Sequence, residues 1–263
     1  MLRSLWTAAT GMAAQQSNID TISNNLANVS TTGFKKNRVE FQDLLYQTIR
    51  PAGMTNSMGT QYPTPIEIGH GTMLSSTQKS FLQGALVATN NTLDVAIQGE
   101  GFFAIQNPNG DVNYTRDGSF KLDAQGNVLT SNGYFLEPPV TIPQDASSVV
   151  IRENGDVVIT TPANTASQVI GTIKLSNFVN PAGLESMGEN LFKSTEASGE
   201  AVDGVPGTGN YGTLAQGQLE ASNVEVVEEM VNMITSQRAY EMNAKAITTS
   251  DQMLQDANNL KST

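Results

Sequence analysis

The chain of 263 residues contains no cysteine, one histidine and one tryptophan. The absence of cysteine excludes disulfide bonds, zinc–thiolate sites and thiol catalysis. His70 lies between Gly69 and Gly71, and no serine, aspartate or second histidine stands near it at the spacing of a known motif. We therefore expect no catalytic residue, no metal site and no cofactor. Aromatic residues make up only 6% of the chain, which is low for a compact enzyme.

Positive charge and long hydrophobic runs are also scarce. The formal net charge of -11 argues against a nucleic-acid partner, because such binding needs a basic surface. No stretch approaches the ~20 apolar residues of a membrane span, so we expect no direct membrane insertion. The first residues lack the continuous apolar core of a signal peptide. If the protein leaves the cytoplasm, we expect it to do so without a cleaved Sec-type signal.

A seven-residue hydrophobic repeat marks the stretch from Ser222 to Leu260. Its members are Leu219, Val226, Met233, Tyr240, Ile247 and Leu254. This spacing is typical of a coiled-coil seam. Ser222 and Glu225 stand at the spacing of a capping box, which predicts that the helix begins there.

The other end of the chain carries a matching repeat of Leu5, Met12, Ile19 and Leu26. We expect it to form a second amphipathic helix that pairs with the first, because an apolar stripe must be buried to stabilise a helix. Polar residues interrupt the predicted seam at Gln16, Ser23, Gln237 and Asp251. The alternative is that both helices pack separately on the protein's own core.

The segment that follows the first helix divides into two parts. Residues 34–49 fit a short helix or a strand equally well. The composition then changes to proline, glycine and polar residues between Arg50 and Thr72, where we expect no regular element. Either a flexible linker or a functional contact segment explains its length.

Residues 73–218 have the pattern of a β-rich domain. Short hydrophobic runs alternate with tight-turn signals, namely Asn109–Gly110, Asp117–Gly118, Gln125–Gly126, Asn132–Gly133 and Asn154–Gly155. The sequence therefore predicts an α+β fold with three parts. These are a helical coiled-coil domain of residues 1–32 and 219–263, a connecting segment of residues 33–72, and the β-rich domain inserted between them.

Both ends resemble the terminal signatures of the bacterial flagellar rod and hook protein family. The N-terminal motif runs from Asn24 to Lys35, and the C-terminal motif comprises 222–224, 229–231 and 237–241. The matching positions include Asn25, Asn28, Gly33, Phe34, Asn223, Gln237, Arg238 and Tyr240. The stretches 99–103 and 114–118 extend the resemblance, and the segment from Tyr46 to Thr72 resembles an insertion found in the distal rod.

The resemblance implies a structural subunit that self-associates head to tail into a hollow helical tube. Its paired terminal helices would line the inner wall and its β-rich domain would face outward. The implied partners are other rod and hook proteins, the surrounding basal-body ring proteins and the type III export apparatus. The implied location is the basal body, where the rod crosses the periplasm, the peptidoglycan and the outer-membrane ring region. Within the tube, the Pro/Gly-rich segment would stiffen the rod through Pro51, Met54, Pro63, Pro65 and His70.

Two alternatives remain open at this point. The chain could be a hook or proximal rod subunit, which the segment from Tyr46 to Thr72 distinguishes from the distal rod. It could instead be a secreted hydrolase or carbohydrate-binding protein built on the β-rich domain, although no acid, base and nucleophile stand together in the sequence.

Overall fold

The computed structural model describes residues 2–54, 61–161 and 164–261, and its fold is α+β, with a helix at each end and a β-rich middle. This confirms the α+β part of the prediction, with a helix at each end and a β-rich middle. The chain forms two compact units. The described part of unit 1 comprises residues 2–26, 37–54, 61–78 and 225–261, and that of unit 2 comprises residues 27–36, 79–161 and 164–224.

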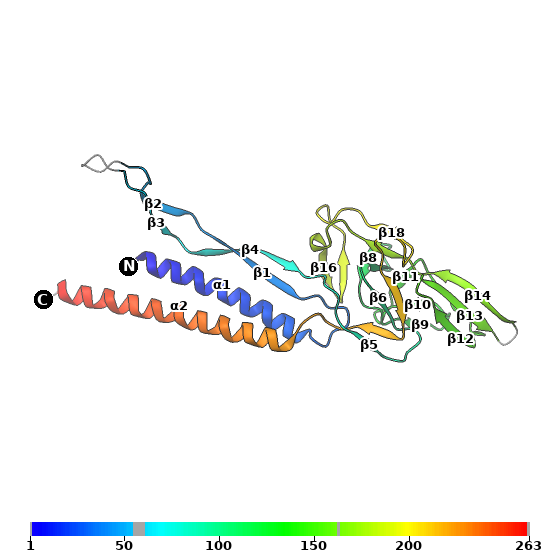
Figure 1. Ribbon diagram of the computed structural model, residues 1–263. Coiled ribbons are helices and arrows are strands. Elements are labelled where there is room, and N and C mark those ends of the chain that lie inside the picture. Colours follow the sequence, from blue (N-terminus) through cyan, green and yellow to red (C-terminus); the bar gives the residue numbers. More distant parts are fainter. Residues whose placement is uncertain (1, 55–60, 162–163, 262–263) are drawn as a thin grey trace. The chain divides into compact units, whose positions relative to one another are not determined.

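Two long helices form most of unit 1. Helix α1 spans Leu2–Ala27, and helix α2 spans Val226–Lys261. They lie side by side in opposite directions, so the two ends of the chain are neighbours (Figure 1). Helix α2 begins four residues later than predicted, at Val226 rather than Ser222. The reason is local, because the Ser222 hydroxyl accepts the N–H of Val224 in a turn before the helix. None of the described helices is long and apolar enough to cross a membrane.

The remainder of unit 1 is a structure that we call the β-arm, which consists of two strand pairs. Its strands are β1 (Asn37–Asp43), β2 (Tyr46–Arg50), β3 (Ile66–Gly69) and β4 (Thr72–Lys79). Strand β1 pairs with β4, and β2 pairs with β3 in antiparallel register. Residues 34–49, whose sequence fits a short helix or a strand equally well, therefore form strands. The expectation of no regular element between Arg50 and Thr72 is wrong, because β3 pairs with β2 within it.

The described part of unit 2 holds the remaining strands and one 3-10 turn, η1 (Pro181–Gly183). The strands are β5 (Leu86–Ala88), β6 (Val95–Gln98), β7 (Phe102–Gln106), β8 (Val112–Thr115), β9 (Lys121–Leu122), β10 (Val128–Leu129), β11 (Phe135–Glu137), β12 (Ser148–Ile151), β13 (Asp156–Thr161), β14 (Asn164–Thr172), β15 (Leu175–Asn177), β16 (Glu185–Gly188), β17 (Leu191–Lys193), β18 (Val202–Gly204), β19 (Thr213–Gln216) and β20 (Gln218–Glu220).

The largest described sheet has the order β16-β17-β8-β7-β11-β10-β9, and β15 joins it by pairing with β7 and β18. Strands β12, β13 and β14 form a separate sheet, while β19 pairs with β6 and β20 pairs with β5. Strand β7 is buried on both faces, because successive side chains point to opposite sides of a sheet. Phe103 and Ile105 enter the main core, and Phe102 enters a second, aromatic core with Phe178 and Phe192.

The predicted turns form at four of the five glycine sites. Gly110, Gly126, Gly133 and Gly155 all have positive φ, a conformation that glycine adopts without steric cost. The turn prediction for Asp117–Gly118 is wrong, since Gly118 is not among the glycines with positive φ. A glycine is needed there for a different reason, because a Cβ atom would collide with the carbonyl oxygen of Val95.

Candidate functional site

A row of small and polar side chains joins α1 to α2, and we call it the polar ladder. Its pairs are Ser4 with Ser250, Gly11 with Asn243, Asn18 with Ser236, and Asn25 with Glu229. Each step of seven residues along α1 is matched by a step of seven back along α2. The helices therefore meet in one antiparallel register.

The two central contacts of the polar ladder are the closest. Asn18 donates to the Ser236 hydroxyl at 2.8 Å, and a Cβ on Gly11 would lie 2.8 Å from Nδ2 of Asn243. Asn25 and Glu229 are 2% and 3% exposed. A neutral hydrogen bond such as that between Asn18 and Ser236 contributes only about 0.5–1.5 kcal/mol, less than the ~1.5–3 kcal/mol of a buried leucine or isoleucine side chain. The ladder therefore fixes how the two helices align, but it contributes only modestly to the stability of the pair.

The hydrophobic repeats lie beside the polar ladder. On α1 each member follows a ladder residue by one position, and Leu5, Met12, Ile19 and Leu26 are all half-buried. On α2 the side chains of Met233, Ile247 and Leu254 are half-buried, while Val226 and Tyr240 are 39% and 38% exposed. The polar residues expected to interrupt the seam are all exposed, namely Gln16, Ser23, Gln237 and Asp251.

Asn25 connects both helices to the β-arm. Its side-chain amide donates to the backbone oxygen of Asn37 at 2.9 Å and to Glu229 Oε2 at 3.3 Å. Its carbonyl accepts the N–H of Asn37 at 2.9 Å. One side chain thus holds the last turn of α1, the first turns of α2 and the start of β1.

The β-arm exposes many apolar side chains. Leu45 is 89% exposed, Ile49 is 59% exposed, and Tyr46, Met54, Ile66 and Leu74 are also exposed. The Arg50 guanidinium lies 3.8 Å from the centre of the Tyr62 ring, and residues 53 and 62 continue the backbone pairing beyond β2 and β3. A two-stranded hairpin of this kind is only marginally stable in water. The surface therefore suits a contact with another molecule.

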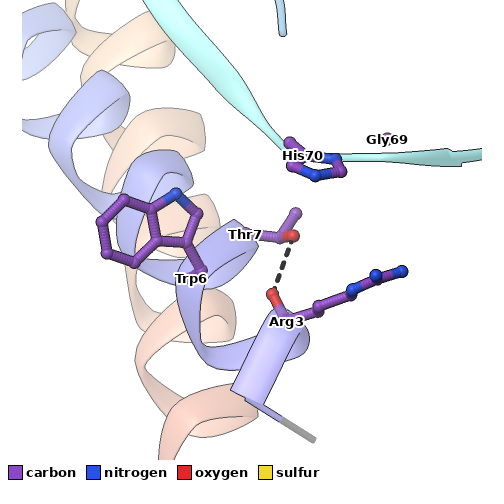
Figure 2. Close-up of a pocket in the computed structure, with 5 residues that line it drawn as sticks. All are labelled: Arg3, Trp6, Thr7, Gly69 and His70. Atoms are coloured by element: carbon purple, nitrogen blue, oxygen red, sulfur yellow. Dashed lines mark hydrogen bonds between the residues drawn. The ribbon is translucent and has the colours of Figure 1, made fainter. Parts of the chain in front are cut away.

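The residues assigned to rod stiffening are all exposed on or next to the β-arm: Pro51, Met54, Pro63, Pro65 and His70. Residues 55–60 of the same segment lie outside the described residues. His70, in the turn between β3 and β4, faces the start of α1 across a cavity of about 280 Å³ lined by Arg3, Trp6, Thr7, Gly69 and His70 (Figure 2). The Thr7 hydroxyl donates to the backbone oxygen of Arg3 at 3.0 Å. Within the described ranges, no three His, Asp or Glu side chains gather closely enough to hold a metal ion.

The remaining signature residues include four that lie in unit 2, where the N- and C-terminal segments meet. Gly33 has a φ of 67° and donates its N–H to the backbone oxygen of Glu220 at 2.8 Å. The Asn223 side chain accepts the N–H of Lys36 and donates to the backbone oxygens of Ser80 and Leu82. Phe34 and Asn28 are half-buried beside this crossing. Gln237 and Arg238 are exposed on α2.

A buried charge cluster holds this crossing together. Lys35 Nζ lies 2.6 Å from Glu220 Oε1, and both side chains have no exposed surface. Arg116 Nε lies 3.3 Å from Glu220 Oε2, and its other nitrogens donate to the backbone oxygens of Gly99 and Gly101. Lys35 also donates to Leu82, and Glu220 accepts the N–H of Gly84. Together these contacts tie segments from both chain ends to the β-rich part of unit 2.

Burial, followed by the nearby Arg116 charge, lowers the pKa of Lys35 below its ordinary 10.5, and the Glu220 carboxylate opposes this shift. Burial also lowers the pKa of Arg116. Sequence reasoning missed this cluster, because Lys35 and Arg116 lay inside the quoted motifs without an assigned role and Glu220 lay outside them. Their separation of at least 81 residues along the chain leaves no local pattern to detect.

Three family models match the chain. The model of the flagellar hook protein FlgE/F/G D1 domain matches residues 96–159, that of the flagellar basal body rod FlgEFG protein C-terminal region matches residues 215–260, and that of the flagella basal body rod protein matches residues 5–35. The matched regions include both helices and the inserted β-rich part.

Curated relatives are similar over their full length. The flagellar basal-body rod protein FlgG of Borreliella burgdorferi is 51% identical over 263 residues, which cover 99% of this chain and 99% of the relative. The protein of the same name from Caulobacter vibrioides is 47% identical over 262 residues, which cover 99% of this chain and 100% of the relative. That of Bacillus subtilis is 40% identical over 269 residues, again covering 99% and 100%.

Glu220→Gln should lower the free energy of unfolding by about 3–5 kcal/mol, because it leaves two buried cations without their anion. Urea unfolding of the full chain, followed by far-UV circular dichroism, measures the loss. The triple variant Lys35→Met, Arg116→Met and Glu220→Leu removes all three charges and should recover most of it. If Glu220→Gln alone is as stable as wild type, the cluster does not hold the crossing.

Proposed function

Because this chain belongs to the flagellar basal-body rod protein family and is a structural subunit of the rod rather than an enzyme, we propose that it forms the distal part of the rod. Copies polymerise there into a hollow helical tube that acts as a rigid drive shaft and as an export channel. The observation that carries the proposal is the similarity to basal-body rod proteins over 99% of the chain.

The terminal helices fit the inner wall of such a tube as an antiparallel coiled-coil pair. In residues 2–27 the only charged side chains are those of Arg3 and Asp20. A nearly neutral helix can pack against several neighbours without burying an unpaired charge. The polar ladder fixes how the two helices of one copy align, and their other faces remain available to neighbouring copies. The predicted seam residues Leu5, Met12, Ile19, Leu26, Val226, Met233, Tyr240, Ile247 and Leu254 flank that ladder and extend this apolar contact surface.

The β-arm accounts for the stiffness of the rod. Its exposed apolar side chains, such as Leu45 and Ile49, reach over adjacent subunits and become buried there. Proline limits the backbone freedom of the segment once it has docked, at Pro51, Pro63 and Pro65. Because the arm contacts a surface other than its own, the interface does not close on itself and generates a filament.

The chain is located in the flagellar basal body, and its partners include other rod and hook components. We further assign contacts to the surrounding ring proteins, which act as a bushing, and to the type III export apparatus. The rod then passes through the periplasm and the peptidoglycan to the level of the outer-membrane rings.

Electron microscopy of isolated basal structures from cells that lack this chain tests the assignment. We expect a short rod that carries no hook and does not reach the outer membrane. Restoring the wild-type chain should restore the full rod. A complete rod without a hook would assign the chain to the hook instead, and intact structures would remove it from the axial assembly.

The modest strength of the polar ladder predicts that the helices order fully only on assembly. In a verified monomer, amide hydrogens of residues 2–27 and 226–261 should exchange faster than those of strand β7 in the core of unit 2. In assembled rods they should be protected. Hydrogen exchange with mass spectrometry measures both states, and strong protection of both helices in the monomer would contradict the expectation.

Deleting residues from Met54 to His70 should produce rods that bend more, because it removes β3 and the apolar surface of the arm tip. The curvature of rods in electron micrographs measures the effect. As a matched control, Val150→Ser changes an apolar residue of similar exposure in unit 2, 47% against 50% for Met54, and should leave the rods straight. Straight rods after the deletion would show that this segment is only a linker.

A further inference from the structure

Each terminal helix exposes a second face opposite the polar ladder. Residues two positions away from a ladder residue lie about 200° around the helix. On α1 this outer face carries Trp6, Ala9 and Ala13, and on α2 it carries Val231, Ile234 and Arg238. All six are exposed, including Trp6 at 67% and Ile234 at 55%.

Among the described residues, the β-arm leaves Ala9 and Ala13 on the outer face of α1 exposed. It meets α1 at Thr10, whose side chain lies against Gly71, and at the cavity lined by Thr7, His70 and Trp6, although Trp6 is still 67% exposed. Figure 2 shows the Trp6 ring extending from α1 away from His70. The helix therefore has one side that contacts α2, one side that contacts the arm, and a third side that is exposed.

We propose that the outer face of α1 in one copy receives the outer face of α2 from a second copy of the chain. This inference rests on the proposed function. In a head-to-tail polymer all copies point the same way, so α1 of one copy runs opposite to α2 of its neighbours. The contact between copies is consequently antiparallel, like the contact within one copy.

The two outer faces are complementary in size. Ala9 and Ala13 are four residues apart, and so are Ile234 and Arg238. An antiparallel alignment places Ile234 on Ala13 and Arg238 on Ala9, with Val231 continuing the row one turn away. Large side chains thus enter a groove formed by small ones, which lets the helices approach closely. Burial of Ile234 and Val231 supplies the hydrophobic part of the contact.

The two faces also offer a cation–π contact, with a cation on α2 and an aromatic ring on α1. In the same alignment the guanidinium of Arg238 reaches the ring of Trp6, which stands one turn before Ala9. Arginine over the face of tryptophan is the most favourable cation–π pair in proteins, and its strength increases when water is excluded. Among the described residues, the ion pair of Arg238 is an exposed one with Glu241 at 3.5 Å. Exposed ion pairs contribute little to stability, so the guanidinium can turn toward a neighbour.

Disulfide trapping can test this contact cleanly, because the chain contains no cysteine. Chains carrying Ala13→Cys and chains carrying Ile234→Cys are expressed together in cells that lack the wild-type chain. Basal structures are isolated, oxidised and run on a non-reducing gel. Both positions point away from the partner helix of their own copy, so a disulfide can form only between copies.

We expect a covalent dimer from the mixed chains, and a ladder of higher oligomers from a chain that carries both substitutions. The matched control is the double variant Ser4→Cys and Ser250→Cys, whose hydroxyl oxygens lie 3.4 Å apart in one copy. Its disulfide should form within one chain and leave the protein monomeric on the gel.

A second set of variants does not depend on cross-linking. Trp6→Ala or Arg238→Ala should reduce the yield of complete rods about tenfold, whereas Trp6→Phe should retain most of it. Combining both alanine changes should reduce the yield of complete rods little more than either change alone, because the first change already removes the interaction of the pair.

The outcomes separate this inference from the proposed function. If the wild-type chain is present in the rods but the mixed cysteine chains give no dimer and the Trp6 and Arg238 variants assemble normally, the contact is wrong and the rod assignment stands. If the wild-type chain is absent from the basal structures, the proposed function fails and the contact fails with it.

Discussion

The carboxylate of Glu220 is the group on which the path of the chain through unit 2 depends. It is fully buried and accepts from Lys35 and Gly84, with Arg116 beside its second oxygen. A buried carboxylate is tolerated only when it is paired and hydrogen-bonded. The segment entering from α1, the segment leaving toward α2 and the β-rich insertion must therefore all be in place together, because each supplies one of the three charges.

The two units consequently differ in how firmly they are held. Unit 2 has a charge cluster and two hydrophobic cores, whereas α1 and α2 meet along the polar ladder of serine, asparagine, glycine and glutamate residues. A subunit that assembles from single chains benefits from this division. Its β-rich part has hydrophobic cores of its own, and its helices retain apolar and neutral faces for neighbours that are not yet present. The proposed rod function requires both properties.

The sequence predicted which elements form more reliably than it predicted which faces they use. A repeat of seven identifies both helices, but the hydrophobic and the polar series have the same period. Periodicity therefore cannot tell which series lies at the contact. Strand β3 was hidden because proline and glycine recur in the segment around it, whereas residues 34–49 fitted a helix and a strand equally well. The cluster of Lys35, Arg116 and Glu220 was invisible, since its members come together only when the fold has formed.

The position of the hydrophobic residues on the helices links folding to assembly. The contact within one copy is polar, whereas the opposite face of α2 carries apolar residues such as Val227 and Val231, which are 70% and 54% exposed. A stable helix pair usually has the apolar face at the contact and the polar face in water. In an isolated protein this arrangement leaves hydrophobic surface in water without any gain in stability. In a polymer the same surface is buried at every contact between copies. The free energy of helix burial is then gained on assembly rather than on folding, which makes the helical part of the subunit depend on its neighbours.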